Sequence, residues 1–140
     1  MTRGGRASLP SVDRLIGSPS GVALAGRYGR EALVDAVRSV LADQRARLAQ
    51  IRRRALEAYA SAALGTAGTE LPAAVRAGRQ LVRLDPLRET GYQILMQALA
   101  AQGNSAEALR VYADLCEVLR DELGVSPSAP IEAVYQSLLR

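Results

Sequence analysis

The three consecutive arginines Arg52, Arg53 and Arg54 are the residues whose chemistry first suggests a function. Arg45 and Arg47 lie just before them, and guanidinium groups clustered in this way can bind phosphates in a strongly salt-dependent manner. Successive residues of a helix are rotated by about 100°, so three of them spread over roughly 200° of its surface. We therefore interpret the triplet as a solvated helix face whose aliphatic stems lie over the core, with a phosphate-contacting cluster as the alternative.

The residue types that catalysis usually requires are scarce. The chain has no histidine, so the commonest general base and metal ligand is missing. Its single cysteine, Cys116, allows neither an internal disulfide nor a cysteine-based zinc site. No phosphate-binding loop, dinucleotide fingerprint or nucleophile elbow is present in the sequence. We predict a protein that is not an enzyme, with no catalytic residue, metal, cofactor or small-molecule substrate.

The hydrophobic pattern predicts helices along the chain and no strand. A short helix is expected after Ser11 and a second short helical turn before Gly29. From residue 30 to residue 64 apolar residues recur at threes and fours without glycine or proline. Because such a helix would be longer than a small domain is wide, we expect a bend, break or boundary at the polar segment 42–47.

Capping signals divide the C-terminal half into further helices. Asp85 is expected to end one helix and to cap the next, with Pro86 at its first position. Asn104 and Glu107 have the spacing of a capping box, in which each side chain accepts a hydrogen bond from the other's backbone N–H. Ser128 is expected to cap the last helix.

Core positions can be assigned from the same spacing. We expect four tyrosine rings to pack between helices while their hydroxyl groups reach the surface, namely Tyr59, Tyr92, Tyr112 and Tyr135. Cys116 and Met96 are expected to be core residues rather than reactive groups.

A weak internal repeat indicates how the helices pack. The segment "PAAVRAGRQLVRL" at 72–84 superposes on "EALRVYADLCEVL" at 107–119 with an offset of 35 residues. Helix–turn–helix units of about 34 residues mark tetratricopeptide-like repeats, which stack because neither helix pair buries its apolar face alone. We predict an all-α fold of tetratricopeptide-like hairpins preceded by a small N-terminal helical segment, with 72–84 and 107–119 as second helices of consecutive hairpins.

Residues 43–140 carry three stretches typical of one family, namely "LDPLRE", "GNSAEALRVY" and "LRDELGVSPS". Through them this part of the chain resembles the bacterial transcriptional activator domain, an all-helical module of actinomycete regulatory proteins. The resemblance implies a non-enzymatic, protein-binding module of a transcriptional regulator, with the transcription machinery or another copy as partner. Members of that family usually place a DNA-reading domain before the part matched, and we expect this chain to lack it.

Residues 9–41 carry a different resemblance. "LPSVDRLI" and "RYGREALVDAVRSVL" are similar to the small N-terminal domain of selenocysteine synthase, which contacts the selenocysteine tRNA. Selenium transfer does not carry over, because all 18 basic residues are arginine and the Schiff-base lysine is absent. The alternative function is therefore a tRNA-binding adaptor, with phosphate contacts from Arg14, Arg27, Arg30, Arg38, Arg45, Arg52, Arg53 and Arg54.

Charge and hydropathy complete the predicted organisation. Residues 1–64 hold 11 arginines and five acidic residues, whereas residues 65–140 hold seven and nine. No apolar run reaches the roughly 20 residues that span a bilayer, and the N-terminus lacks the apolar core of a secretion signal. We expect a cytoplasmic protein without membrane contact, divided into a disordered tail (1–8), a helical segment (9–42) and the activator-like module (43–140). The module alone should melt cooperatively, and 1–42 alone should be largely unfolded.

Overall fold

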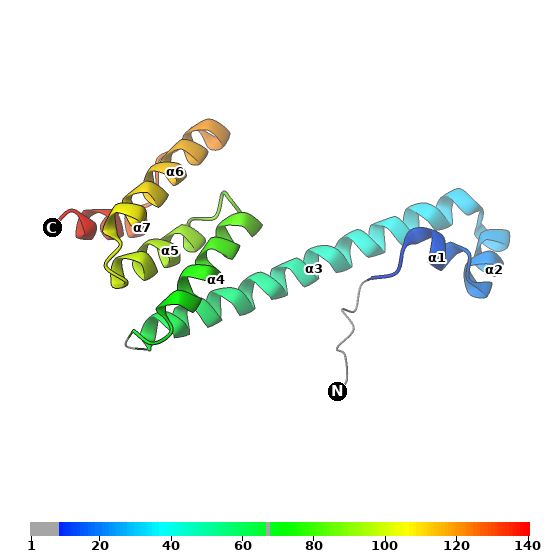
Figure 1. Cartoon of the computed structure of the whole chain (residues 1–140). Coiled ribbons are helices and arrows are strands. Elements are labelled where there is room, and N and C mark those ends of the chain that lie inside the picture. Colours follow the sequence, from blue (N-terminus) through cyan, green and yellow to red (C-terminus); the bar gives the residue numbers. More distant parts are fainter. Residues whose placement is uncertain (1–8, 67) are drawn as a thin grey trace. The chain divides into compact units, whose positions relative to one another are not determined.

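The computed structural model describes residues 9–66 and 68–140, so the predicted tail 1–8 lies outside it. Every regular element in these ranges is a helix, which confirms the all-α prediction (Figure 1). The elements are α1 (Val12–Ile16), α2 (Pro19–Tyr28), α3 (Arg30–Gly65), α4 (Leu71–Leu84), α5 (Glu89–Ala101), α6 (Ser105–Leu123) and α7 (Ala129–Leu138). Within the described ranges, none of these helices is both long and apolar enough to cross a membrane.

The chain divides into two compact units, unit 1 up to Ile51 and unit 2 from Arg52 onward. Helix α3 is continuous through 42–47, so the break expected there does not occur. The polar side chains of that segment are exposed, and a solvated face does not interrupt a helix. The separability of 1–42 from 43–140 stays a prediction.

Unit 1 begins with two capped helices that approach each other closely. The Ser11 hydroxyl accepts a hydrogen bond from the N–H of Arg14 at 3.3 Å, as predicted, and Ser18 accepts one from Gly21 at 3.1 Å. A Cβ on Gly21 would overlap the carbonyl oxygen of Leu15 and lie 2.6 Å from that of Ile16. Only glycine therefore lets the first turn of α2 lie against the end of α1.

The apolar core of unit 1 is small. Ile16 and Leu41 are buried, and Leu33 and Val37 are half-buried. Leu24 and Val40 do not join them and are 43% and 58% exposed. The buried apolar surface of unit 1 is therefore smaller than its number of apolar residues would allow.

Unit 2 consists of two helical hairpins and a final helix. The C-terminal part of α3 packs on α4 through Ala60, Ala77 and Leu81, and α5 packs on α4, α6 and α7. The predicted repeat segments lie in α4 and α6, each the second helix of its hairpin. Both contribute to one core cluster, through residues such as Ala74 and Ala108, and α5 packs between them, as in the predicted tetratricopeptide-like arrangement.

The core of unit 2 depends on a close crossing of α4 and α5. A Cβ on Gly78 would lie 3.0 Å from the Cβ of Leu95, and one on Gly91 would lie 3.0 Å from the Cβ of Leu81. The largest fully buried side chains are Met96, Leu99, Leu115 and Ile131.

The assignments of core residues from spacing are partly confirmed. Met96 and Tyr92 are buried, and Tyr112, Tyr135 and Cys116 are half-buried. The assignment of Tyr59 is wrong, since this residue is 53% exposed. It lies at the edge of the packed face of α3, beside Leu56 and Ala63, so helical spacing alone did not show that it stays in solvent.

The turn between α4 and α5 differs from the prediction. Asp85 follows the last residue of α4, and its carbonyl accepts a hydrogen bond from the N–H of Arg88 at 3.1 Å. Helix α5 begins only at Glu89, so the prediction that Asp85 caps it with Pro86 at the first position is wrong. The carboxylate that would have capped α5 is instead bound by Arg53.

The two other predicted caps are realised in part. Asn104 accepts from the N–H of Glu107 at 3.3 Å, but Glu107 accepts from the side-chain amide of Asn104 at 2.6 Å rather than from its backbone. The backbone N–H of Asn104 donates to Leu99 instead. Ser128 occupies the cap position of α7, yet its hydroxyl donates to Glu89.

We expect Asn104→Ala to lower the free energy of unfolding of unit 2 by about 1 kcal/mol. The reason is that the first turn of α6 loses its side-chain acceptor. Urea denaturation followed by circular dichroism measures the change, and Ser105→Ala, at the neighbouring exposed position, serves as control. Equal midpoints and slopes for Asn104→Ala and the parent chain would contradict the assignment.

Candidate protein-interaction surface

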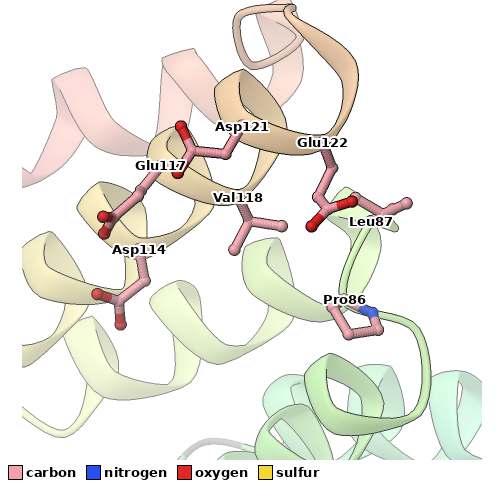
Figure 2. A pocket seen from close by; sticks show the side chains of 7 residues that line it. All are labelled: Pro86, Leu87, Asp114, Glu117, Val118, Asp121 and Glu122. Carbon is pink, nitrogen blue, oxygen red and sulfur yellow. The ribbon is translucent and has the colours of Figure 1, made fainter.

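A groove of about 590 Å³ lies between α6 and the turn that joins α4 to α5. Figure 2 shows its residues projecting from these two elements. The turn contributes Pro86 and Leu87, and α6 contributes Asp114, Glu117, Val118, Asp121 and Glu122.

The position of the groove follows from helix lengths and side-chain spacing. Helix α6 has 19 residues against 13 in α5, so its last turns reach past the start of α5 and face the α4–α5 turn. Residues three, four and seven apart lie on one side of a helix, which groups the α6 side chains of the groove. Val118 lies among them and is half-buried. The result is an apolar strip with carboxylates beside it.

The charge of the groove is largely uncompensated. Asp121 pairs with its exposed neighbour Arg120 at 3.1 Å, a surface contact of small energy. In the described part of the chain, Asp114, Glu117 and Glu122 form no ion pair. Burial, and secondarily the negative charge of Asp114, raises the pKa of Tyr92. The groove therefore favours a ligand with an apolar surface and positive charge.

A chain of ion pairs holds the turn that forms one wall of the groove. Arg53 Nη1 lies 3.1 Å from Asp85 Oδ2, and its Nε lies 3.9 Å from Glu57 Oε1. Arg88 Nε reaches the same Glu57 oxygen at 3.0 Å. Two arginines and two carboxylates alternate, so the turn is fixed to α3 within unit 2. The Arg53 and Glu57 side chains are only 24% and 19% exposed, which strengthens these pairs relative to fully solvated ones.

This network separates the three arginines that the sequence places side by side. Arg53 is partly buried and paired, whereas Arg52 and Arg54 are exposed on other sides of α3. The other residues suggested for phosphate contact are exposed in unit 1, namely Arg14, Arg27, Arg30, Arg38 and Arg45. Arg27 stacks over Tyr28 at 5.4 Å, and Arg38 lies 3.9 Å from Asp35. Nucleic-acid contact by these eight arginines stays a prediction.

A second polar cluster joins α6 to α7. The Tyr112 and Tyr135 rings stack with centroids 4.0 Å apart and planes at 14°. The Tyr112 hydroxyl donates to Glu132, which also accepts from Gln136 at 3.1 Å. The hydrogen bond to Glu132, together with burial, raises the pKa of Tyr112 above its usual range. The hydrogen bonds from Tyr112 and then Gln136 lower the pKa of Glu132.

We expect Tyr112→Phe to move the pKa of Glu132 upward. The substitution removes the Tyr112 hydroxyl, whose hydrogen bond contributes most to lowering that pKa. A carboxylate whose pKa is lower in the folded state adds stability above its unfolded pKa and loses it as pH falls through the folded pKa. In the Tyr112→Phe variant, the free energy of unfolding should therefore fall less steeply as the pH drops from the unfolded to the folded pKa of Glu132. Carbon-detected NMR titration of the Glu132 carboxyl group measures the shift. Tyr135→Phe, which leaves the Tyr112 hydroxyl in place, is the control, and an unchanged Glu132 midpoint in Tyr112→Phe contradicts the assignment.

Hairpins with a groove along one helix define the class of the protein as a helical-repeat module. Within that class the bacterial transcriptional activator domain family matches residues 23–139, and the chain belongs to this family. The match confirms the resemblance of the C-terminal part and begins 20 residues before the predicted start at 43.

Individual relatives match shorter stretches of the chain. The regulatory protein AfsR of Streptomyces coelicolor is 45% identical over 60 residues, which are 43% of this chain and 6% of the relative. The AfsR of Streptomyces griseus matches to the same extent. The L-seryl-tRNA(Sec) selenium transferase of Methylocella silvestris is 51% identical over 41 residues, 29% of this chain and 9% of the relative. The chain thus spans less than a tenth of each of these relatives, and no solved structure matches it.

Proposed function

We propose that the chain is a non-enzymatic protein-interaction module of a bacterial transcriptional regulator. The observation that carries this proposal is the groove on α6, which combines Leu87 and Val118 with four carboxylates. Membership of the activator-domain family and similarity to two Streptomyces regulatory proteins support the link to transcription. A cytoplasmic location is part of the proposal.

The chemistry of the groove suggests what it binds. Covering Leu87 and Val118 removes apolar surface from water, which stabilises a complex in proportion to the area covered. The carboxylates around them select against acidic partners and speed the encounter with basic ones. We infer that the groove accepts a protein segment that presents apolar side chains between arginines or lysines.

A reporter assay tests the regulatory role. The chain is fused to an unrelated DNA-binding domain in a Streptomyces host whose reporter carries the matching operator. A groove-reversed variant, Glu117→Arg with Glu122→Arg, should lower the reporter signal several-fold at equal protein level. A control with the same charge change, Glu31→Arg with Asp43→Arg, alters exposed sites in unit 1 and should keep the signal. Equal signals from both variants would count against the groove.

A second candidate function is contact with tRNA through unit 1. The observation that favours it is the 51% identity over 41 residues to an L-seryl-tRNA(Sec) selenium transferase, together with exposed arginines in unit 1. Retention on immobilised tRNA at rising salt tests it. A tRNA-binding unit should lose retention steeply with salt, and more easily when glutamine replaces Arg14, Arg27, Arg30 and Arg38. Elution at low salt, unchanged by those substitutions, excludes this candidate.

A further inference from the structure

Helix α3 carries an apolar stripe with seven-residue spacing in unit 1. Apolar or uncharged side chains alternate at intervals of three and four residues, the spacing that forms a continuous seam on a helix. They are Val34, Val37, Leu41, Gln44, Leu48 and Ile51.

The stripe is covered at one end and open at the other. Leu41 is 4% exposed, and Val34 and Val37 are half-buried. Leu48 and Ile51 are 50% and 64% exposed, so the seam continues beyond the core of unit 1. We call the two residues Leu48 and Ile51 the open stripe. Two large apolar side chains on adjacent turns of a seam are suited to packing against another surface.

Charged residues beside the open stripe restrict what can cover it. The helix rotation places Arg45 on one side of Leu48 and Arg47 on the other, and both are exposed. Two identical stripes packed on each other would bring arginines together, and like charges at such a seam are unfavourable. The surface that covers the open stripe must therefore be apolar with acidic residues on both sides.

The groove on α6 has this complementary pattern. Val118 corresponds to Leu48, and the same rotation places Glu117 and Glu122 on its two sides. Leu87, 41% exposed, extends the apolar strip across the groove. Each surface thus has an apolar centre between two like charges, and the charges on the two surfaces are opposite.

We propose that the open stripe of one copy of the chain docks in the groove of a second copy. This inference rests on the proposed function and names the second copy as the occupant of the groove. Because different surfaces meet, the contact is heterologous, and every copy offers both halves of it. Association should rise with protein concentration and fall as salt screens the exposed charges.

Sedimentation equilibrium of the purified full chain, repeated at low and high salt, tests the proposal. The parent chain should associate at low salt. The groove-reversed variant places arginines on both surfaces and should bind itself at least about tenfold more weakly. A stripe-reversed variant, Arg45→Glu with Arg47→Glu, places acids on both surfaces and should be weakened equally.

Mixing the two variants makes the test specific. The acidic groove of the stripe-reversed chain then meets an arginine stripe, and the arginine groove of the other chain meets a glutamate stripe. Equal amounts should therefore recover association close to that of the parent chain. Control substitutions Arg76→Glu with Arg110→Glu alter exposed sites outside both surfaces and should leave self-association intact. Circular dichroism confirms that each variant is folded.

Two outcomes overturn the second copy as occupant. One is a parent chain that stays monomeric at high concentration and low salt, and the other is a mixture of folded variants that fails to associate. Neither result decides the reporter assay, because that assay tests the groove whatever its occupant is. If the parent chain is monomeric and the groove-reversed variant still lowers the reporter signal, the groove binds another protein.

Discussion

Leu115→Ala is expected to lower the free energy of unfolding of unit 2 by about 2–5 kcal/mol. Leu115 is fully buried in α6 and belongs to the core cluster that contains Met96, Leu99 and Ile131. Truncation removes apolar contacts and leaves a cavity among helices α5, α6 and α7, which are fixed by their other contacts. The cost therefore includes both the lost transfer free energy and the unfilled space.

Urea denaturation with circular dichroism and tyrosine fluorescence measures this loss. Leu123→Ala is the matched control, because it makes the same change on the same helix at a residue that is 54% exposed. The control should change stability by no more than about 0.5 kcal/mol. Similar effects from the two substitutions would mean that α6 does not pack as described.

Gly78→Val should destabilise unit 2 by about 1–3 kcal/mol, toward the upper end of that range. A single Cβ at this position already lies 3.0 Å from Leu95 Cα and Cβ and 3.1 Å from its backbone nitrogen. Two of these atoms belong to the buried backbone of α5, and the Cβ is fixed directly to it, so none of them can rotate away. The extra methyl groups of valine must therefore push α4 and α5 apart.

Thermal denaturation and the amide NMR shifts of α5 report this displacement. Gly65→Ala is the control, because nothing lies within 4 Å of a Cβ at this position in the last residue of α3. We expect that substitution to be neutral or slightly stabilising. An α5 whose amide shifts are unchanged in Gly78→Val would contradict the close crossing.

Local sequence signals predicted the helices and their repeat. The matching segments 72–84 and 107–119 lie in α4 and α6. They could be found because the apolar spacing of a helix is visible within a short stretch of sequence. Ser11 and Asn104 could be recognised as caps for the same reason, since each hydrogen bond reaches only three residues along the chain.

Where the sequence predicted a cap wrongly, the side chain is bound by a residue far away in the chain. Asp85 does not cap α5, because Arg53, 32 residues away, binds its carboxylate. The Ser128 hydroxyl is likewise taken by Glu89, 39 residues away. The acidic side chains of the groove do carry a signal, since Asp114, Glu117 and Asp121 have helical spacing. The opposite wall, Pro86 and Leu87, is brought there only by the turn that Arg53 and Arg88 hold.

The stacked pair of Tyr112 and Tyr135 gives the protein a built-in optical probe. The chain has no tryptophan, so its near-ultraviolet emission comes from tyrosine alone, and four of its five tyrosines follow residue 51. A hydroxyl bonded to a carboxylate and a ring stacked on another ring both change emission when they separate. Undocking of α7 can therefore be followed in unlabelled protein, while the far-ultraviolet signal reports all the helices. The two signals together distinguish loss of the last helix from melting of the rest.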